Sequence, residues 1–319
     1  MFKFRMAEMQ GVVNMLPLVR KFFKDERGTA VVIIAAAFAV LMGFTALAID
    51  SGILYLEHTR MARAADASVL AGAQELPDTA GARSNALDYA QRNGIDPSTL
   101  DISFSADNKQ ITVTARKPVN LYFAKLIGFN TSTVKGTATA RIAPVKITRG
   151  LIPVGINEVM LPLTVGQEYM IKAGAHSNVQ GWREIIEFPG ENGATDYRNT
   201  SLNGYPNTVQ INDQVGKAAG NMSGPTMQGL QERIDNCTDG STWNNYQPGC
   251  PRVVLVPIYR DLAPENKVKI VGFASVFLER VTGNGQESEV YAKYINNTVF
   301  GETDDSLTNS YLNSVRLVQ

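Results

Sequence analysis

The clearest feature of the hydrophobic pattern is an uncharged apolar run of 21 residues from Thr29 to Ile49, TAVVIIAAAFAVLMGFTALAI. At about 1.5 Å per residue, a helix over this run would be roughly 30 Å long, which matches the hydrocarbon core of a bilayer. A core helix of a soluble domain is the alternative, but such helices usually keep a polar stripe and this run has none. The pattern therefore predicts a transmembrane helix over Thr29–Ile49. The run starts too late and is too long for a cleaved secretory signal, so we expect a retained anchor.

Helical periodicity continues beyond the apolar run, and we expect one helix over Thr29–Leu76, which is 48 residues or roughly 70 Å long. Glu57 with Arg60, and Arg63 with Asp66, are spaced one turn apart, as in solvent-facing ion pairs. Residues 50–76 are thus predicted to form a helical stalk. Its many alanines favour close packing against another helix. Two interpretations stay open at this point: a stalk packed on its own domain, and an intermolecular bundle that makes a homo-oligomer.

The charges on the two flanks predict the orientation. Asp50 and Ser51 directly follow the run, and the next basic residue is Arg60. Six basic residues precede the run: Lys3, Arg5, Arg20, Lys21, Lys24 and Arg27. By the positive-inside rule, residues 1–28 are expected in the cytoplasm and residues from about Asp50 onward outside. The loosely amphipathic residues 1–24 are expected to lie on the inner membrane face, with a leader peptide as the open alternative.

Residues 77–143 alternate between helical and strand patterns and predict a small α+β module. The module combines a helix, a hairpin around 106–109, a short helix and a further strand. The expected elements are a helix at Ala82–Arg92, strands at Ile102–Ser105 and Ile111–Thr114, a short helix at Pro118–Leu126 and a strand at Val134–Ala143.

Residues 144–319 contain more Gly, Asn and Pro and predict a β-rich extracytoplasmic domain, so that the whole chain is of the α+β class. Val268–Leu278 is expected to be a central buried strand, because it is almost continuously apolar. Met227–Ile234 is the best helix, and Pro189–Pro206 and Asp235–Gly249 are expected to be loops. The other expected strands are Leu151–Val154, Glu168–Lys172, Val253–Tyr259 and Tyr311–Val318.

The only two cysteines, Cys237 and Cys250, bracket the second of these loops and are thirteen positions apart. A disulfide is chemically permitted outside the membrane, and closing a loop of this size contributes about 3 kcal/mol in the chain-entropy account. A thiol pair that binds metal is the competing interpretation, but further ligands are missing nearby. We therefore predict a Cys237–Cys250 disulfide.

Composition excludes several function classes. The chain has 30 basic and 30 acidic residues, which argues against a nucleic-acid-binding surface. Its two histidines, His58 and His176, leave little room for histidine-dependent catalysis or a zinc site, and no cofactor or metal is expected. Asp101–Ser105 spells the D-x-S-x-S pattern of metal-ion-dependent adhesion sites, but its serines alternate with apolar residues as in a strand, so metal binding is not expected there. Thr303–Ser306 and Gly283–Gly285 could hold calcium, although such polar loops are more often simply solvated.

Two further residues with possible roles are the tryptophans. Trp182 and Trp243 are interpreted as core residues, with carbohydrate stacking as the alternative.

Several short motifs, in a fixed order and spacing, resemble the N-terminal region of TadE/TadG-like tight-adherence (Flp) pilus-assembly proteins. The motif positions include Gly28, Asp50, Gly52 and Asp66. The motifs are Glu26–Gly28 before the apolar run, Ala48–Gly52 at its outer end, Ala64–Ala73 in the stalk, and a continuation through Ala86–Gly94 to about Ala143. The resemblance implies a single-span envelope protein of the bacterial cytoplasmic membrane, without catalysis of its own.

One departure from the family pattern concerns processing. Processed prepilins carry Glu at the fifth position after the cleavage glycine, and the residue five after Gly28 is Ile33. This difference favours the membrane-retained, TadG-like branch.

Two function classes follow. The leading one is a membrane-anchored structural component of a Tad pilus or related surface apparatus, which presents an outward-facing domain for adhesion or assembly to other pilus-assembly proteins. The alternative is a cell-surface enzyme that uses carboxylates alone, such as a glycosidase, with Glu184 and Glu187 as an example of a candidate pair.

Overall fold

The computed structural model describes residues 26–174, 185–218, 220, 222–283, 287–299, 301–307 and 311–318. The chain divides into two compact units. The first, which we call the anchor unit, combines the chain up to Arg63 with residues 115–136. The second, the body unit, comprises residues 64–114 and 137–319.

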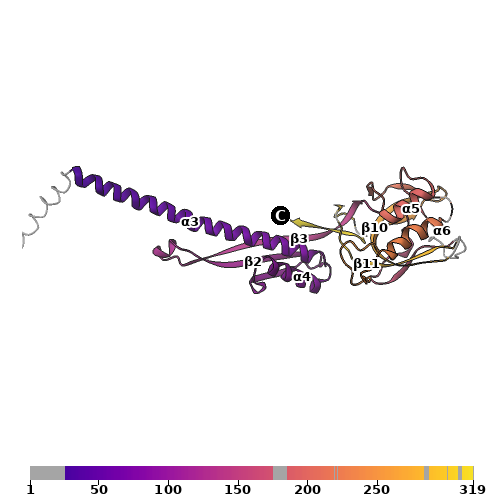
Figure 1. Cartoon of the computed structure of the whole chain (residues 1–319), viewed down its shortest axis with the longest axis horizontal. Coiled ribbons are helices and arrows are strands. Elements are labelled where there is room, and N and C mark those ends of the chain that lie inside the picture. The colour runs from indigo at the N-terminus through magenta and orange to yellow at the C-terminus, as the bar shows by residue number, and fades with distance from the viewer. Residues whose placement is uncertain are drawn as a thin grey trace, which may run out of the picture. The chain divides into compact units, whose positions relative to one another are not determined.

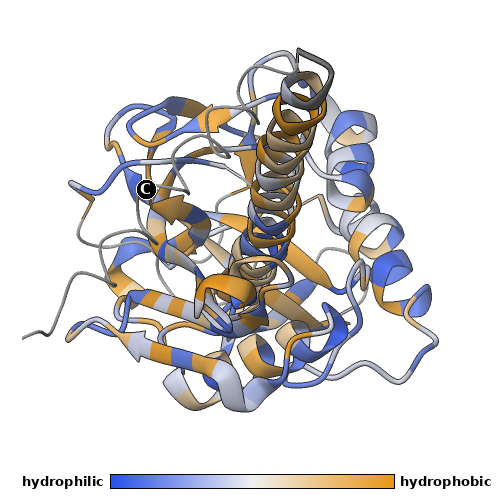
Figure 2. Cartoon of the chain, turned by 90° about the vertical axis from the view of Figure 1, so that its left-hand side faces the viewer, coloured by the Kyte–Doolittle hydropathy of each residue, from blue (hydrophilic) through white to orange (hydrophobic). Residues whose placement is uncertain are grey.

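Helix α3 (Glu26–Ala73) is 48 residues long and confirms the predicted continuous helix, with both ends shifted by three residues (Figure 1). The side chains of its apolar part, 29–49, are almost all exposed, and apolar residues predominate along this part in Figure 2. The next residue, Asp50, is by contrast buried, since only 5% of its surface is exposed. A solvent-exposed apolar stretch followed by a buried acid is the opposite of the pattern expected for a soluble protein.

In the anchor unit, α3 lies beside the outer half of a long hairpin. Strands β2 (Gln110–Asn120) and β3 (Thr131–Thr148) form the hairpin, and the short 3-10 helix η2 (Ala124–Ile127) lies in its turn. The short helix predicted over Pro118–Leu126 is therefore wrong before Ala124. Strand β2 continues to Asn120, and only the turn at Ala124–Ile127 is helical.

The body unit contains the rest of the predicted α+β module. Helix α4 (Thr79–Arg92), the turn η1 (Pro97–Thr99) and strand β1 (Leu100–Phe104) confirm the predicted helix and hairpin, and the strand order is β1-β2-β3. Small residues allow close packing in this unit. A Cβ on Gly72, for example, would lie only 2.8 Å from the Ala82 carbonyl oxygen. The end of α3 is buried in this core, whose members are Ala65, Val69, Ala73, Ala82, Ala86, Ile111 and Val113 among others. From Ala64 onward the alanine-rich face therefore packs on its own chain.

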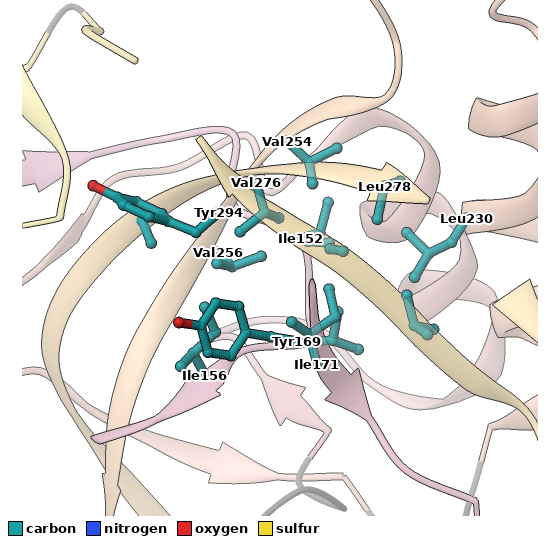
Figure 3. Packing of buried hydrophobic residues seen from close by; sticks show 14 of the residues in the cluster. Ile152, Ile156, Tyr169, Ile171, Leu230, Val254, Val256, Val276, Leu278 and Tyr294 are labelled. Carbon is teal, nitrogen blue, oxygen red and sulfur yellow. The ribbon is translucent and has the colours of Figure 1, made fainter. Parts of the chain in front are cut away.

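A seven-stranded sheet dominates the remainder of the body unit. Its strands follow the order β4 (Ile156–Asn157), β9 (Val253–Asp261), β10 (Lys267–Thr282), β11 (Glu289–Ile295) and β5 (Glu168–Lys172), with β6 (Ile186–Glu187) and β8 (Gln214–Lys217) attached at one side. Strand β10 (Lys267–Thr282) is central and buried from Phe273 to Leu278, which confirms the predicted core strand. It pairs antiparallel with β9 and β11, and Ser275 lies opposite both Leu255 and Ile295. Figure 3 shows side chains of three of these strands, including Val256, Val276 and Tyr294, meeting in one apolar core.

The remaining strands and helices have the following bounds. The strands are β4 (Ile156–Asn157), β5 (Glu168–Lys172), β6 (Ile186–Glu187), β7 (Val209–Gln210), β8 (Gln214–Lys217), β9 (Val253–Asp261), β11 (Glu289–Ile295), β12 (Glu302–Thr303) and β13 (Asn313–Val318). The helical segments are η3 (Glu158–Met160), α5 (Gly193–Asn203), α6 (Ser223–Thr226), the π-helical turn η4 (Met227–Gln231) and α7 (Glu232–Asp235).

Strand β3 continues from the α+β module of the body unit into the region that contains the seven-stranded sheet. It runs through residues 143–144 without interruption, and β13 returns from the end of the described chain to pair with it, with Val315 opposite Ile142. Strands β7 and β12 pair with the far end of β3. The division of the chain into domains at 143/144 remains a prediction.

The predicted loop Pro189–Pro206 is wrong over most of its length, because it contains helix α5. This segment has weak helix propensity, so tertiary packing must stabilise the helix. Helix α5 buries Tyr197, Thr200 and Ser201, and a Cβ on Gly229 would lie 2.6 Å from the Ser201 Cβ. The predicted strand Leu151–Val154 is reduced to isolated bridges at its two ends.

Candidate membrane-proximal site and interaction groove

Asp50, a family-motif position, binds the turn of the β2–β3 hairpin. Its carboxylate accepts three backbone N–H groups, from Tyr122 at 2.9 Å, Phe123 at 3.0 Å and Ala124 at 2.7 Å. A carboxylate has about four acceptor positions, and three of them are used here by adjacent amides of one turn. Asp50, which directly follows the apolar run of α3, therefore holds the turn of the hairpin against the helix.

A second set of contacts holds the strands of this hairpin against α3. Glu57 accepts hydrogen bonds from Arg60, as the sequence predicts, and from Lys117 on β2, each at 2.8 Å. His58 Nδ1 donates to the Lys135 carbonyl oxygen of β3 at 2.9 Å. The predicted solvent-facing pair of Glu57 and Arg60 thus also connects the helix to strand β2. No pattern in the sequence identifies Lys117 as the third member of this contact.

Gly136 marks the closest approach of β3 to α3. A Cβ on this residue would lie 2.3 Å from the carbonyl carbon of Met61 and 2.5 Å from its oxygen, where no side chain fits. A glycine inside a strand is a signal of close backbone approach, and this signal in the sequence could have identified the contact.

The other family-motif positions lie in different surroundings. Gly28 is in the first turn of α3. Gly52 and Asp66 are exposed, and a Cβ on Gly52 would meet no atom within 4 Å. Among the motif positions whose surroundings the structure describes, Asp50 is the one that lies in a contact site.

The two cysteines lie together, as the sequence predicts. Their sulfur atoms are 3.4 Å apart, beyond the bonded distance of about 2.05 Å, so the disulfide itself remains a prediction. Both pack with Phe277 and Ile295, and Trp243 and Tyr246 of the intervening loop join this cluster. Burial raises the pKa of the Cys237 thiol to about 11.

A groove of about 800 Å³ in the body unit runs beside this loop. Trp243 and Tyr246 form part of its wall, so the predicted core role of Trp243 is incomplete, because the ring is only half-buried. Lys293 Nζ lies 5.6 Å from the centroid of the Trp243 ring, within cation–π range. Amide side chains supply most of the polar lining, and Glu75 adds one acid: the lining includes Gln74, Glu75, Asn244, Asn245, Asn296 and Asn297.

A second hollow, of about 410 Å³, holds two acids, Glu191 and Asp196. Each is bound within or beside α5: Thr200 donates its hydroxyl to Glu191, and the Asn192 N–H donates to Asp196 at 2.8 Å. Burial raises the pKa of the Glu191 carboxyl. Both acids thus have a local role at the start of a helix.

The remaining candidate chemistry is partly outside the described residues. His176, Trp182 and Glu184 lie there, so the pairing of Glu184 with Glu187 has no geometry to compare, and the Gly283–Gly285 loop is described only at Gly283. Over the ranges that the structure does describe, no three His, Cys, Asp or Glu side chains gather as metal ligands.

Two predicted polar motifs are ordinary turn and strand elements. In the D-x-S-x-S motif, Asp101 and Ser103 are exposed on strand β1 while Ile102 is buried, as the alternation predicts. Asp304 Oδ1 accepts a hydrogen bond from the Ser306 N–H at 3.0 Å, and its Oδ2 forms an ion pair with Lys146 at 3.6 Å. Both oxygens of its carboxylate therefore have partners within the protein.

These features define a class of protein. Within the described residues, one helix, α3, is long and apolar enough to cross a membrane, and an α+β region with two sheets follows it.

Residues 28–75 match a family model, described as putative Flp pilus-assembly TadE/G-like. The match covers nearly all of α3 and confirms the resemblance seen in the motifs from Gly28 to Ala73; the continuation through Ala86–Ala143 lies outside it. The chain therefore carries a TadE/G-like domain, which supports a structural role in Flp pilus assembly, and the match does not separate TadE from TadG. Neither curated proteins nor solved structures give a significant match.

Proposed function

We propose that this protein is a membrane-retained, TadG-like structural component of a Tad (Flp) pilus-assembly apparatus. The observation that carries the proposal is the TadE/G-like match at 28–75, which falls on the helix whose apolar part is exposed and long enough to cross a bilayer. A non-enzymatic role fits this placement, because the matched residues supply an anchor and a core-forming helix end rather than reactive groups.

The proposed orientation has the N-terminus in the cytoplasm and the residues after Asp50 outside. Its support is the surplus of basic residues before Thr29 and their absence between Asp50 and Tyr55 on the other side. The test is labelling of a Val159→Cys variant in intact spheroplasts with a membrane-impermeant maleimide, because Val159 is highly exposed. The parent chain, with its two native cysteines, gives the background. Labelling only after lysis would reverse the orientation.

Retention of the whole N-terminal segment is the second part of the proposal, supported by Ile33 at the position where prepilins carry Glu. Mass spectrometry of the protein purified from membranes measures its N-terminus. We expect no cleavage after Gly28. A mature chain that starts at Thr29 would place the protein in the processed, pseudopilin branch instead.

The groove beside the cysteine-bracketed loop is the proposed contact surface for another pilus-assembly protein. Leu70 and Glu75, from the end of the matched region, line it together with Trp243 and Tyr246 from the loop. Half-buried aromatic side chains surrounded by polar groups are typical of interface hot spots. The amides offer both donors and acceptors, which suits an extended polypeptide more than an apolar ligand.

An Asn245→Arg variant tests this contact in the producing bacterium, because Asn245 is exposed in the groove and an arginine there would obstruct it. Asn236→Arg is the matched control, since Asn236 is exposed at the end of α7 and does not line the groove. We expect the first variant to reduce surface pili and the second to leave them unchanged, at equal protein levels. Normal pili with reduced attachment in the Asn245 variant would show that the groove serves adhesion. No effect on either would remove the groove from the proposal.

A further inference from the structure

The turn of the β2–β3 hairpin carries an apolar surface that the proposed function leaves unexplained. This segment, which we call the hairpin tip, covers residues 121–130 and reads LYFAKLIGFN, with one basic residue and no acidic one. Five of its large apolar side chains are exposed: Tyr122 at 68%, Phe123 at 41%, Leu126 at 84%, Ile127 at 76% and Phe129 at 64%. Contiguous apolar surface of this kind marks an interaction site.

The tip is a folded element with fixed side-chain positions. The Leu121 N–H donates to the Asn130 carbonyl at 3.0 Å and closes its base, and the Phe129 N–H donates to the Ala124 carbonyl at 3.0 Å. Gly128 ends the short helix η2 at φ = +96°, a conformation that favours glycine. The apolar side chains therefore point outward because the turn holds its backbone in this form.

The contacts of Asp50 decide where this surface lies. Asp50 directly follows Ile49, the last residue of the apolar run, and its carboxylate lies within 3.0 Å of three amide nitrogens of the tip. The polar interface adds roughly 5–8 Å on each side of the hydrocarbon core. A turn fixed to the first residue beyond the core thus lies at the depth of the interface, whichever way the helix is oriented.

The composition of the tip matches this depth. Tyrosine and other aromatic side chains are enriched at membrane interfaces, where an apolar ring and a polar group are both accommodated. Lys125, exposed within the tip, is suited to the anionic headgroups of the bilayer, and the absence of acids removes repulsion from them.

We propose that the hairpin tip inserts into the interface of the same bilayer that α3 crosses, so that the chain has two membrane contacts, a spanning helix and an interfacial turn tied together by Asp50. Leu126, Ile127 and Phe129 enter the apolar boundary while Lys125 pairs with lipid phosphates. The second contact restricts the tilt and rotation of α3, because a single helix in a bilayer is free to turn about its axis. This inference rests on the membrane span and not on the role in pilus assembly.

Photo-crosslinking of the full-length chain in nanodiscs of phosphatidylethanolamine and phosphatidylglycerol tests the proposal. Benzoylphenylalanine replaces Leu126 in the tip, Val32 in the apolar run or Val159 in the body unit; all three residues are well exposed, so the probe causes little disturbance. Mass spectrometry then identifies what each probe has captured. We expect lipid adducts at Leu126 and Val32, and several-fold less at Val159.

The controls separate the possible failures. Lipid adducts at Val32 without adducts at Leu126 would overturn the insertion of the tip while leaving the span intact. Absence of lipid from both positions would overturn the span and the tip together. An adduct of two protein copies at Leu126 would replace the bilayer with a second copy of the chain as the occupant of this surface.

Discussion

Gly136→Ala is expected to release the hairpin from α3, because the added Cβ has no space. It would lie 2.3 Å from both the Met61 carbonyl carbon and the Ala62 amide nitrogen, whereas ordinary contacts begin at 3.4 Å. The obstructing atoms belong to a helix backbone, so they cannot move aside as a flexible side chain would. Strand β3 must therefore retreat by about 1 Å, and overpacking of this kind costs about 1–3 kcal/mol.

This retreat also weakens the contacts on either side of the glycine. The hydrogen bond between His58 and the Lys135 carbonyl is next to it, and the Lys117–Glu57 ion pair lies on the partner strand. At about 1.36 kcal/mol per factor of ten, the loss corresponds to roughly 5- to 150-fold more frequent opening of the hairpin. Hydrogen exchange of the full-length chain in nanodiscs, followed on peptides from 115–120 and 131–136, measures this change directly.

Gly52→Ala is the matched control. It makes the same substitution on α3, where the new methyl group would meet nothing within 4 Å, and alanine favours a helix over glycine by about 1 kcal/mol. Exchange in the hairpin should stay at the parent value in this variant. Equal exchange in the Gly136 variant and the parent would refute the close approach of strand and helix, and with it the anchoring of the hairpin.

Two further predictions concern the body unit. Oxidation is expected to join Cys237 to Cys250. Because this bridge contributes about 3 kcal/mol by restricting the unfolded chain, reduction should loosen the loop between the two cysteines but leave β10 protected in hydrogen exchange. Free thiols in protein isolated under oxidising conditions would contradict this prediction. Lys172 is fully buried, its Nζ donates to Ser288, and burial lowers its pKa from 10.5 to about 8, so the unfolded chain binds more protons than the folded one between these pH values. The free energy of unfolding should therefore rise by at most about 3 kcal/mol from pH 8 to pH 10.5, as measured in guanidinium titrations of the detergent-solubilised chain. The rise should be smaller in Lys172→Met. In the exposed control, Lys267→Met, the rise should equal that of the parent chain. A slope that persists in Lys172→Met would show that another group causes it.

Elements with strong periodicity could be predicted from the sequence. Helix α3 has an uncharged apolar run followed by spaced alanines, and both patterns have the helical period, so its length was correct and its ends were shifted by three residues. Strand β10 is almost continuously apolar and could be identified as the centre of the sheet, and β5 has the predicted bounds Glu168–Lys172. In each case local sequence and tertiary burial favour the same structure.

Elements whose stability comes from distant contacts could not be predicted. Helix α5 has two Asn, two Thr and one Gly among its eleven residues, and it forms because Tyr197 and Ser201 pack against other segments, including Gly229. Strand β11 was missed although Val290, Ala292 and Tyr294 alternate inward, because Glu289 before them and Lys293 between them obscured a short run. The contact of Asp50 with the hairpin tip joins residues more than 70 positions apart, and no local pattern records such a partner.

Burial differs among three stretches of one unbroken helix, and each stretch has a compositional cause. The apolar side chains of 29–49 are exposed, which is stable only where the surroundings are apolar, as in a bilayer. Asp50 is buried under backbone donors at the point where that environment must end. Beyond Ala64 the small side chains are buried again, this time in protein, since alanine allows the close approach of α4 and the sheet. The TadE/G-like match at 28–75 covers all three stretches. A soluble core helix would have no reason to place a buried acid at the end of an exposed apolar run, and this argument for the membrane span is independent of the length of the helix.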